Sequence, residues 1–357
     1  MVNFTPGPSE LYFTVPDHLR RAVKADIPSL SHRSKAFEGI FREATEGLRQ
    51  LLGIPAGFHV AFCGSATEIW ERSIQSLVGE TSFHLVNGAF SKRYFEISKQ
   101  LGRKAMAVTV PDGNGFGPIV IPPGQELIAI THNETSTGVV LPNDIFRSAR
   151  QQQPDALIVV DAVSSLPYAD LDYSVIDSVF FSVQKGFGLP AGLGVWIYND
   201  RCVEKVNQLQ AAGKFVGTYH SLASLHSFSL KHQTPETPNV LSIYLLGKVI
   251  GDFLRRGLTI IRRETEYKAA VLYGVLDQHP KVKPFVTNTI NRSPTVITVS
   301  CPGVLQELSA ALESQGLQPG EGYGASKSSQ LRFANFPAHS KEVYEMLADK
   351  LSQFEYS

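Results

Sequence analysis

A lysine stands where an apolar segment gives way to a glycine-rich one. Lys185 follows the apolar residues 180–183 and Gln184. The bend-forming residues after it are Gly186, Gly188, Pro190, Gly192 and Gly194. Because an ammonium group is costly to remove from water, either Lys185 extends its charged end into solvent or burial lowers the pKa of its amine. An amine with a lowered pKa is a candidate for covalent and proton-transfer chemistry.

Lys185 is one of several polar residues that directly follow a predicted apolar strand. The five segments of this kind are 64–67, 87–90, 132–135, 161–165 and 184–185. In open parallel α/β sheets, ligands bind beyond the carboxyl ends of the strands. We therefore expect all five segments to lie along one edge of the sheet and to form a single site.

Two of these segments have simple structural explanations when each is taken alone. Asp161 ends the strand ALIVV and could be a turn or N-cap residue. Ser65 could simply cap a helix that begins at Ala66, although the same helix N-terminus could bind an anion through its free N–H groups. The glycine-rich residues 113–117 do not follow a strand, and no GxGxxG motif is present, so a nucleotide-binding oxidoreductase is disfavoured.

Together, the five segments supply the groups that pyridoxal phosphate needs. A lysine forms a Schiff base with its aldehyde, a carboxylate pairs with its pyridinium nitrogen, a helix N-terminus holds its phosphate and an aromatic side chain stacks on its ring. Asp161 would keep the ring nitrogen protonated, so that the ring accepts electrons from the substrate. Lys185 would then move the α-proton as base and acid. The predicted cofactor is pyridoxal 5'-phosphate.

Length and composition predict a soluble protein without a polyanionic partner. The chain has 357 residues, 43% of them hydrophobic, and its 33 basic and 33 acidic residues balance. Cys63, Cys202 and Cys301 show no metal-ligand spacing, and three scattered cysteines fit a reducing compartment. We see no signal peptide and no membrane segment. We therefore expect a cytoplasmic protein that binds no metal, nucleic acid or membrane.

Short apolar segments alternate with amphipathic ones through the first two thirds of the chain. Strands are predicted at 58–63, 82–86, 105–110, 126–131, 156–160, 178–183 and 194–198, and helices at 66–78, 89–101 and 143–152. ALIVV at 156–160 is apolar throughout, and SVFFSV at 178–183 is apolar apart from two serines, as is typical of strands buried on both faces of a parallel sheet. This alternation predicts a doubly wound α/β fold.

The pattern changes near Pro238. Helices are predicted at 240–256, 259–276, 304–315 and 339–354, with strands at 295–299 and 330–333. We expect three parts: an N-terminal arm, residues 1–20, that returns to the small domain; a large cofactor-binding domain, residues 21–257; and a small C-terminal α/β domain, residues 258–357.

Nine motifs, in sequence order, resemble those of the class V aminotransferases of fold type I, most closely the phosphoserine aminotransferases. They are Phe4–Pro8, Ser31–Ser34, Gly64–Thr67, Asn133–Thr135, Asp161 with Ser164–Ser165, Gln184–Gly186, Thr234–Thr237, Ile243–Gly247 and Leu331–Asn335. Each motif alone is unspecific, but the resemblance runs from end to end. It implies a large domain with a mainly parallel central sheet and a smaller C-terminal α/β domain.

The resemblance also implies roles for individual residues. Lys185 would carry the Schiff base and Asp161 would pair with the ring nitrogen. The other cofactor contacts would come from Ser65 and Ala66 (phosphate, through N–H groups), Gln184 (phosphate), Phe90 (ring stacking), Thr135 (phenolic oxygen), and Gln233 and Thr234 (phosphate, across a dimer interface). A homodimer with shared active sites follows from this resemblance.

Two arginines are candidate substrate ligands. Arg332 lies between Leu331 and Phe333 and suits a bidentate pair with the substrate α-carboxylate, unless it is exposed on an edge strand. Arg33, in the motif SHRS, resembles the arginine that meets the distal or phosphate group of the substrate; the alternative is a solvated loop arginine.

The substrate is less well specified than the chemistry. Phosphoserine enzymes carry a His-Arg pair shortly before the carboxylate-binding arginine, but here Ala325 and Ser326 take that place, followed by Lys327. Amino transfer from phosphoserine to 2-oxoglutarate is the leading prediction. The alternative is a transaminase of the alanine–glyoxylate or serine–pyruvate type, a branch that segment 134–139 resembles.

Three further alternatives concern other residues or activities. A non-catalytic relative would lack the lysine or the aspartate, and both are present. A desulfurase would need an exposed cysteine of low pKa on a mobile loop, and Cys301 lies instead on an apolar strand. His132 could donate to a cofactor ligand or be a structural histidine.

Overall fold

A seven-stranded mixed sheet forms the centre of the larger part of the molecule. The computed structural model describes residues 1–354. The strand order is β2 (Phe58–Cys63), β10 (Gly194–Asn199), β9 (Ser178–Ser182), β8 (Leu157–Asp161), β5 (Leu127–Thr131), β3 (Thr81–Val86) and β4 (Lys104–Thr109). Neighbouring strands are parallel except β10, which runs antiparallel to both β2 and β9. This is the predicted α/β class with a mainly parallel sheet.

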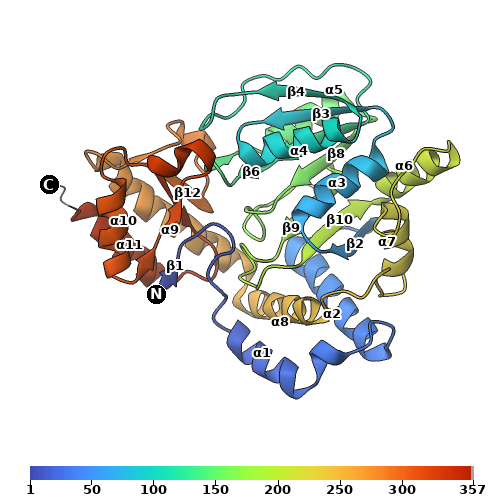
Figure 1. Cartoon of the computed structure of the whole chain (residues 1–357), viewed down its shortest axis with the longest axis horizontal. Helices are drawn as coiled ribbons and strands as arrows, with labels where there is room; N and C mark the ends of the chain where they lie inside the picture. Colours follow the sequence, from blue (N-terminus) through green and yellow to red (C-terminus); the bar gives the residue numbers. More distant parts are fainter. Residues whose placement is uncertain (355–357) are drawn as a thin grey trace.

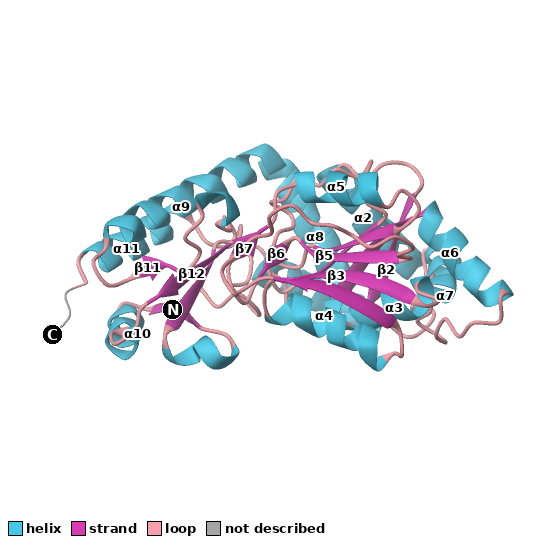
Figure 2. Cartoon of the chain, turned by 90° about the horizontal axis from the view of Figure 1, so that it is seen from above, coloured by secondary structure: helices cyan, strands magenta, loops and turns pink. Residues whose placement is uncertain are grey.

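Helices cover both faces of this sheet, as Figures 1 and 2 show. One apolar core joins the sheet to α2 (Lys35–Leu52), α5 (Asp144–Gln152) and α8 (Val240–Arg256). The other joins it to α3 (Ala66–Leu77), α4 (Ala89–Gln100), α6 (Asp200–Ala211) and α7 (Leu222–Ser229). Strand β8 explains the arrangement: Ile158 and Val160 enter the first core, and Leu157 and Val159 the second. Because side chains alternate along a strand, an all-apolar strand needs helices on both sides.

The smaller part of the molecule has its own sheet and core. Strands β11 (Lys283–Pro284), β12 (Val296–Ser300), β15 (Gln330–Ala334) and β14 (Gly320–Glu321) form the sheet. Helices α9 (Leu258–Gln278), α10 (Leu305–Ser314) and α11 (Lys341–Ser352) pack on it. Each strand and helix predicted from sequence is present, with ends that shift by at most two residues.

The chain start returns to this smaller part. β1 (Val2–Asn3) pairs in parallel with β13 (Leu317–Gln318), and Phe4 is fully buried in the small core. Helix α1 (Val15–Lys24) follows and packs against α8. The remaining short strands, β6 (Asn133–Glu134) and β7 (Val139–Val140), form a separate pair.

The predicted domain boundaries stay predictions. Helix α1 crosses position 20, and α8 and α9 meet at Gly257, where φ is +88°. Residues 355–357 of the predicted small domain lie outside the described residues. Between residues 1 and 354, no helix is both long and apolar enough to span a membrane.

Candidate active site

A cavity of about 200 Å³ opens at one edge of the large sheet. This is the edge at which the sequence analysis expects the site. Its walls come from the ends of β5, β8 and β9, the starts of α3 and α4, the N-terminal segment and the small domain. The predicted residues that line it are Ser65, Ala66, Phe90, Thr135, Asp161, Gln184, Lys185 and Arg332. Residues that the sequence analysis did not assign also line it, among them Gly7, Trp70, Ser182 and Tyr323.

Lys185 is buried, with 7% of its surface exposed, so it does not extend into solvent. It lies in the loop that connects the antiparallel strands β9 and β10, and its Nζ donates to Thr135 Oγ1 at 2.9 Å. Burial lowers the pKa of Lys185, Asp161 opposes this effect, and Arg332 adds to it. The amine therefore loses its proton more readily than a surface lysine does.

The N-terminal segment closes over this lysine. Gly7 has φ of +142°, and a Cβ added there would lie 2.8 Å from Lys185 Cε. Ser9 N donates to Gln184 O at 3.0 Å, which fixes the same segment to the lysine loop. A glycine is required at this position both by the backbone angle and by the space that the lysine side chain occupies.

Asp161 is the last residue of β8 and is 2% exposed. Its Oδ2 accepts a hydrogen bond from Trp70 Nε1 at 2.8 Å and its Oδ1 accepts one from Val163 N at 3.0 Å. Burial raises the pKa of Asp161, and the hydrogen bonds from Val163 and Trp70 and the charge of Lys185 oppose that rise. The carboxylate caps no helix and faces the cavity.

Trp70 is a site residue that the sequence analysis missed. Trp70 lies four residues after Ala66 in α3, and residues four apart share one helix face. Both are buried, and Ala66 begins beside the sheet edge. This spacing is the signal that could have placed Trp70 beside Asp161.

The start of α3 presents backbone N–H groups to the cavity. Ser65 is the N-cap, and its Oγ accepts from Glu68 N at 3.1 Å, as the simple capping interpretation requires. The N–H of Ala66 donates to Ser182 Oγ at 2.8 Å, so this predicted phosphate donor already has a partner within the protein. A Cβ at Gly194 would lie 2.6 Å from the carbonyl carbon of Ser65, so glycine permits this close approach of β10.

Phe90 lies on the first turn of α4, with Lys185 Nζ 5.2 Å from its ring centroid. The buried carboxylate of Glu134 holds this turn by accepting from Ser91 N at 2.9 Å and Phe90 N at 3.3 Å. Gly88, the N-cap residue, has no side chain to do so. Glu134 therefore acts as a cap from another segment and sets the position of the Phe90 ring.

Thr135 and Arg332 connect the two parts of the molecule at the cavity. Thr135 Oγ1 accepts from Lys185 and donates to Ser164 Oγ at 2.9 Å. Arg332 Nη1 donates to Thr135 O at 3.1 Å, and its Nε donates to Glu321 O at 2.7 Å. Burial lowers the pKa of Arg332 to about 10. Strand β15 lies between β12 and β14, so the alternative of an exposed edge-strand arginine is wrong.

Three of the predicted residues lie together, but they do not line this cavity. Arg33 Nη1 donates to Gln233 Oε1 at 2.9 Å and to Thr234 O at 2.8 Å. Arg33 also lies 4.9 Å from the ring centroid of Phe228. Arg33, Gln233 and Thr234 thus form one cluster, and Arg33 has protein partners rather than solvent alone.

The segment in place of the usual His-Arg pair is a short 3-10 turn, Gly324–Ser328. Lys327 Nζ lies 3.2 Å from Glu321 Oε2, and both side chains are mostly exposed. Within residues 1–354, Arg332 is the only arginine that lines the cavity.

The remaining candidates do not line the cavity. His132 is buried, and burial lowers its pKa to about 4, while its ring packs against Phe146. Cys63, Cys202 and Cys301 are buried, and burial raises the pKa of Cys301 to about 11. None of the three is the exposed, low-pKa thiol of a desulfurase.

The cavity has the donor set that pyridoxal phosphate requires. It combines a buried amine, a buried carboxylate, an aromatic ring and a helix N-terminus. Gln184 Oε1 and Asn133 Oδ1 are buried and have no hydrogen-bond partner among the described residues, although both residues line the cavity. Buried polar atoms are normally paired, so a polar ligand is expected here.

The chain is similar in sequence and in structure to known aminotransferases. The sequence profile of the aminotransferase class V family matches residues 115–353. A phosphoserine aminotransferase from Rhodococcus opacus is 29% identical over 98% of this chain and 93% of that protein. The crystal structure of a phosphoserine aminotransferase from Cytophaga hutchinsonii is 47% identical, covers 99% of this chain and 98% of that chain, and superimposes with a TM-score of 0.97.

A more distant structure shares the fold. An aspartate aminotransferase from Thermus thermophilus is 24% identical and covers 99% of this chain and 98% of that chain, with a TM-score of 0.86. Since the family profile covers the segment from before Thr135 to beyond Arg332, and solved aminotransferases superimpose on almost the whole chain, the protein belongs to the class V aminotransferases of fold type I and is a transaminase that depends on pyridoxal phosphate.

Proposed function

We propose that the protein transfers the amino group of phosphoserine to 2-oxoglutarate, and the reverse. The names of the relatives from Rhodococcus opacus and Cytophaga hutchinsonii support this pair of substrates. The observation that carries the proposal is the meeting of Lys185, Asp161 and Arg332 in one cavity of about 200 Å³. When bound, the cofactor supplies an aldehyde for the amine and a ring that accepts electrons from the α-carbon.

In this proposal Lys185 and Asp161 are the catalytic residues. Lys185, with its lowered pKa, takes a proton from the substrate α-carbon and returns one later. Asp161, which Trp70 and Val163 hold by hydrogen bonds, would accept a hydrogen bond from the protonated ring nitrogen. Thr135, whose hydroxyl accepts a hydrogen bond from Lys185 and donates one to Ser164, would bind the phenolic oxygen.

The other cavity residues bind and orient. Phe90, held by the Glu134 cap, would stack on the ring. Ser65, Ala66 and Gln184 would contact the phosphate; because Ala66 N donates to Ser182 Oγ, it would have to share or exchange that bond. Arg332 would pair with the substrate carboxylate and keep it at the small-domain side of the cavity.

A spectrum and a rate test the chemistry. The purified protein with pyridoxal phosphate should be yellow, and Lys185→Ala should lose both the absorbance of the lysine-bound cofactor and the transaminase activity. Asp161→Asn should keep the absorbance and lose most of the rate, because the paired charge is gone. A Lys185→Ala variant with an unchanged spectrum would overturn the assignment of the lysine.

The alternative donor is alanine or serine, and one observation favours it. Lys327 follows Ala325 and Ser326, which stand in place of the His-Arg pair of phosphoserine enzymes. Its side chain is mostly exposed and already paired with Glu321, so it is a poor ligand for a substrate phosphate. Initial rates with phosphoserine, serine and alanine at equal concentrations separate the two. A preference for phosphoserine supports the leading proposal. Equal rates would show that the enzyme does not recognise a substrate phosphate and would favour a transaminase of the alanine–glyoxylate or serine–pyruvate type.

We also propose a cytoplasmic homodimer with shared active sites. The cluster of Arg33, Gln233 and Thr234 lies outside the cavity of its own chain, so in a dimer it is free to complete the cavity of the partner. The three free cysteines fit a reducing compartment. An arm of residues 1–20, a large domain of 21–257 and a small domain of 258–357 remain our proposed division.

A further inference from the structure

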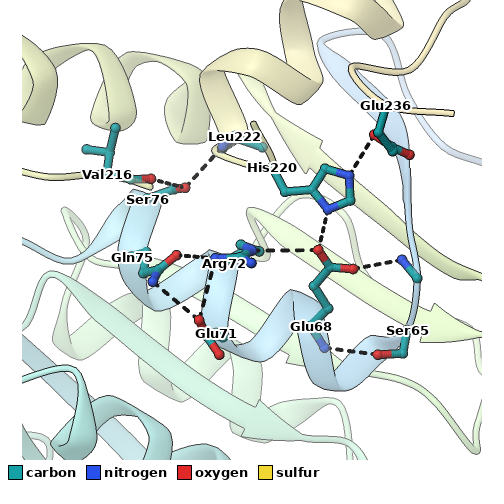
Figure 3. A network of polar contacts seen from close by, with 11 residues as sticks. Ser65, Glu68, Glu71, Arg72, Gln75, Ser76, Val216, His220, Leu222 and Glu236 are labelled. Carbon is teal, nitrogen blue, oxygen red and sulfur yellow. Dashed lines mark hydrogen bonds and ion pairs between the residues drawn. The ribbon is translucent and has the colours of Figure 1, made fainter. Parts of the chain in front are cut away.

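A histidine between two carboxylates connects helix α3 to the segment after α7. His220 is 5% exposed; its Nδ1 contacts Glu68 Oε1, and its Nε2 lies 2.7 Å from Glu236 Oε2 (Figure 3). A neutral imidazole has one N–H donor and one lone pair, so it can satisfy only one carboxylate. With both carboxylates ionised, the arrangement requires the doubly protonated, positively charged ring.

The charge on His220 has a clear electrostatic origin. Burial acts to lower the pKa of His220, but the hydrogen bonds and charges of Glu236 and Glu68 outweigh burial and raise the pKa to about 9. The groups that face the ring are Glu68 and Arg72 of α3, Glu236, Cys63 of β2 and the adjacent Tyr219. Burial raises the pKa of the Cys63 thiol, so this residue adds no charge at neutral pH.

Glu68 brings a negative charge to the start of α3. Its Oε2 accepts from Gly64 N at 2.8 Å, while Ser65 Oγ accepts from Glu68 N, so the two side chains together bind one N–H before the N-cap and one in the first turn of α3 (Figure 3). The same N-terminus is where our proposed function places the cofactor phosphate. A carboxylate beside a phosphate dianion repels it unless a cation lies close. Arg72 Nε is 3.6 Å from Glu68 Oε1, and His220 is in direct contact with that oxygen.

The other carboxylate belongs to the segment that carries Gln233 and Thr234. Thr234 Oγ1 donates to the backbone oxygen of Glu236 at 2.8 Å, and Arg33 donates to the backbone oxygen of Thr234. A single cation at His220 therefore holds two pieces of phosphate-binding structure: the start of α3 in its own chain, and the segment that we propose reaches the cofactor of the partner.

We propose that protonated His220 is a positioning residue for the cofactor phosphate, because it neutralises Glu68 at the start of α3 and holds the 233–236 segment in place. The inference rests on the proposed function, since that function puts the phosphate at α3. It predicts that cofactor affinity depends on a residue that does not line the cavity. It also predicts that affinity falls at alkaline pH: the charged form is present below about pH 9 and is lost as the pH rises through that value.

The test uses the full-length protein freed of cofactor and pyridoxamine 5'-phosphate as the probe. This amine form of the cofactor forms no bond to Lys185, so its dissociation constant reports non-covalent binding alone. At pH 7.5 we expect His220→Gln to weaken binding about tenfold or more, the equivalent of one lost charged hydrogen bond. The matched control is His226→Gln on α7, which lies outside the network and should bind within about twofold of wild type.

A double variant separates charge from shape. If His220 acts by neutralising Glu68, then Glu68→Gln/His220→Gln should recover most of the affinity that His220→Gln loses. Equal weakness of the single and double variants would overturn the charge compensation, and unchanged binding by His220→Gln would overturn the whole proposal. Should His220→Gln fail to fold, the pH profiles of wild type and Glu68→Gln decide: wild type must lose more affinity than Glu68→Gln as the pH rises through about 9, and parallel profiles would overturn the proposal.

Two further controls complete the experiment. Cys63, Glu68 and His220 place potential ligand atoms within 4.8 Å of one another, so binding is repeated with EDTA. Unchanged affinity in EDTA supports ion pairing, and a loss of affinity would show a metal ion in the cluster and overturn the proposal. A wild-type protein that binds no pyridoxamine phosphate at any pH would instead refute the proposed function itself.

Discussion

The indole of Trp70 donates a hydrogen bond to Asp161 Oδ2 at 2.8 Å, inside the protein and at the wall of the cavity. The backbone N–H of Val163 holds the other carboxylate oxygen at 3.0 Å. Both donors stabilise the ionised form of a carboxylate whose pKa burial raises. The charge of Asp161, which we propose pairs with the cofactor, therefore depends on a side chain of α3 as well as on β8.

Replacing Trp70 by Phe should weaken this pairing without removing the aspartate. We expect the pKa of Asp161 to rise and kcat to fall about tenfold, because one hydrogen bond to a charged group is lost. A pH titration of the cofactor absorbance, together with kcat, measures both effects. Trp196→Phe is the matched control, since Trp196 Nε1 donates to Ser178 Oγ in the core; it should lower stability and leave the titration unchanged. Identical titrations in the two variants would contradict this role of Trp70.

Gly7→Ala should disturb Lys185 directly. The new Cβ would lie 2.8 Å from Lys185 Cε, and φ of +142° is unfavourable for alanine. We expect kcat to fall about tenfold or more and the free energy of unfolding to fall by about 1–2 kcal/mol. Gly39→Ala is the control: it lies in α2 with nothing within 4 Å of the added Cβ, so it should raise the free energy of unfolding by about 0.5–1 kcal/mol and leave kcat unchanged.

Arg332→Lys keeps the charge but removes the planar pair of donors. We expect KM for the amino acid substrate to rise about 10- to 100-fold while the cofactor spectrum stays the same, because two hydrogen bonds to a carboxylate are lost. Steady-state kinetics and the absorption spectrum measure the two quantities. Arg292→Lys, which removes a comparable pair to Asp277 away from the cavity, should leave KM unchanged. A spectrum that changes while KM does not would place Arg332 on the cofactor instead.

Mixing inactive variants tests the shared active sites. A Lys185→Ala chain and an Arg33→Ala/Gln233→Ala chain, expressed together, should give heterodimers with one intact site each. Random pairing then restores about a quarter of the wild-type activity. Lys185→Ala mixed with Asp161→Asn should restore little, because both changes lie in the cavity of their own chain. No recovery in the first mixture would mean that each chain builds its site alone.

The site residues that can be predicted from sequence are reactive or polar residues that end or follow an apolar strand. Lys185, Asp161 and Thr135 follow or end apolar strands, and the sheet rule places them at one edge. The orientation of β10 was not predicted, because periodicity reports burial and not strand direction. The Glu134 cap on α4 was missed for another reason: residues 88 and 134 are far apart in sequence, and no local pattern connects them.

The role that we propose for a second chain could not be derived from local patterns and came only from the family resemblance. The structure brings Arg33, Gln233 and Thr234 together, but no spacing in the sequence indicates that they would meet. Trp70 was within reach, since its spacing from Ala66 follows the helix period. The role of His220 could not be predicted from sequence, because its two partners come from α3 and from the segment before α8, and only folding brings them together.

The pairing of β1 with β13 has a consequence for how the protein is made. The ribosome produces Val2 almost at once and Leu317 only after nearly the whole chain, so the β1–β13 pair cannot form until synthesis is almost finished. Contacts between such distant residues form late in folding.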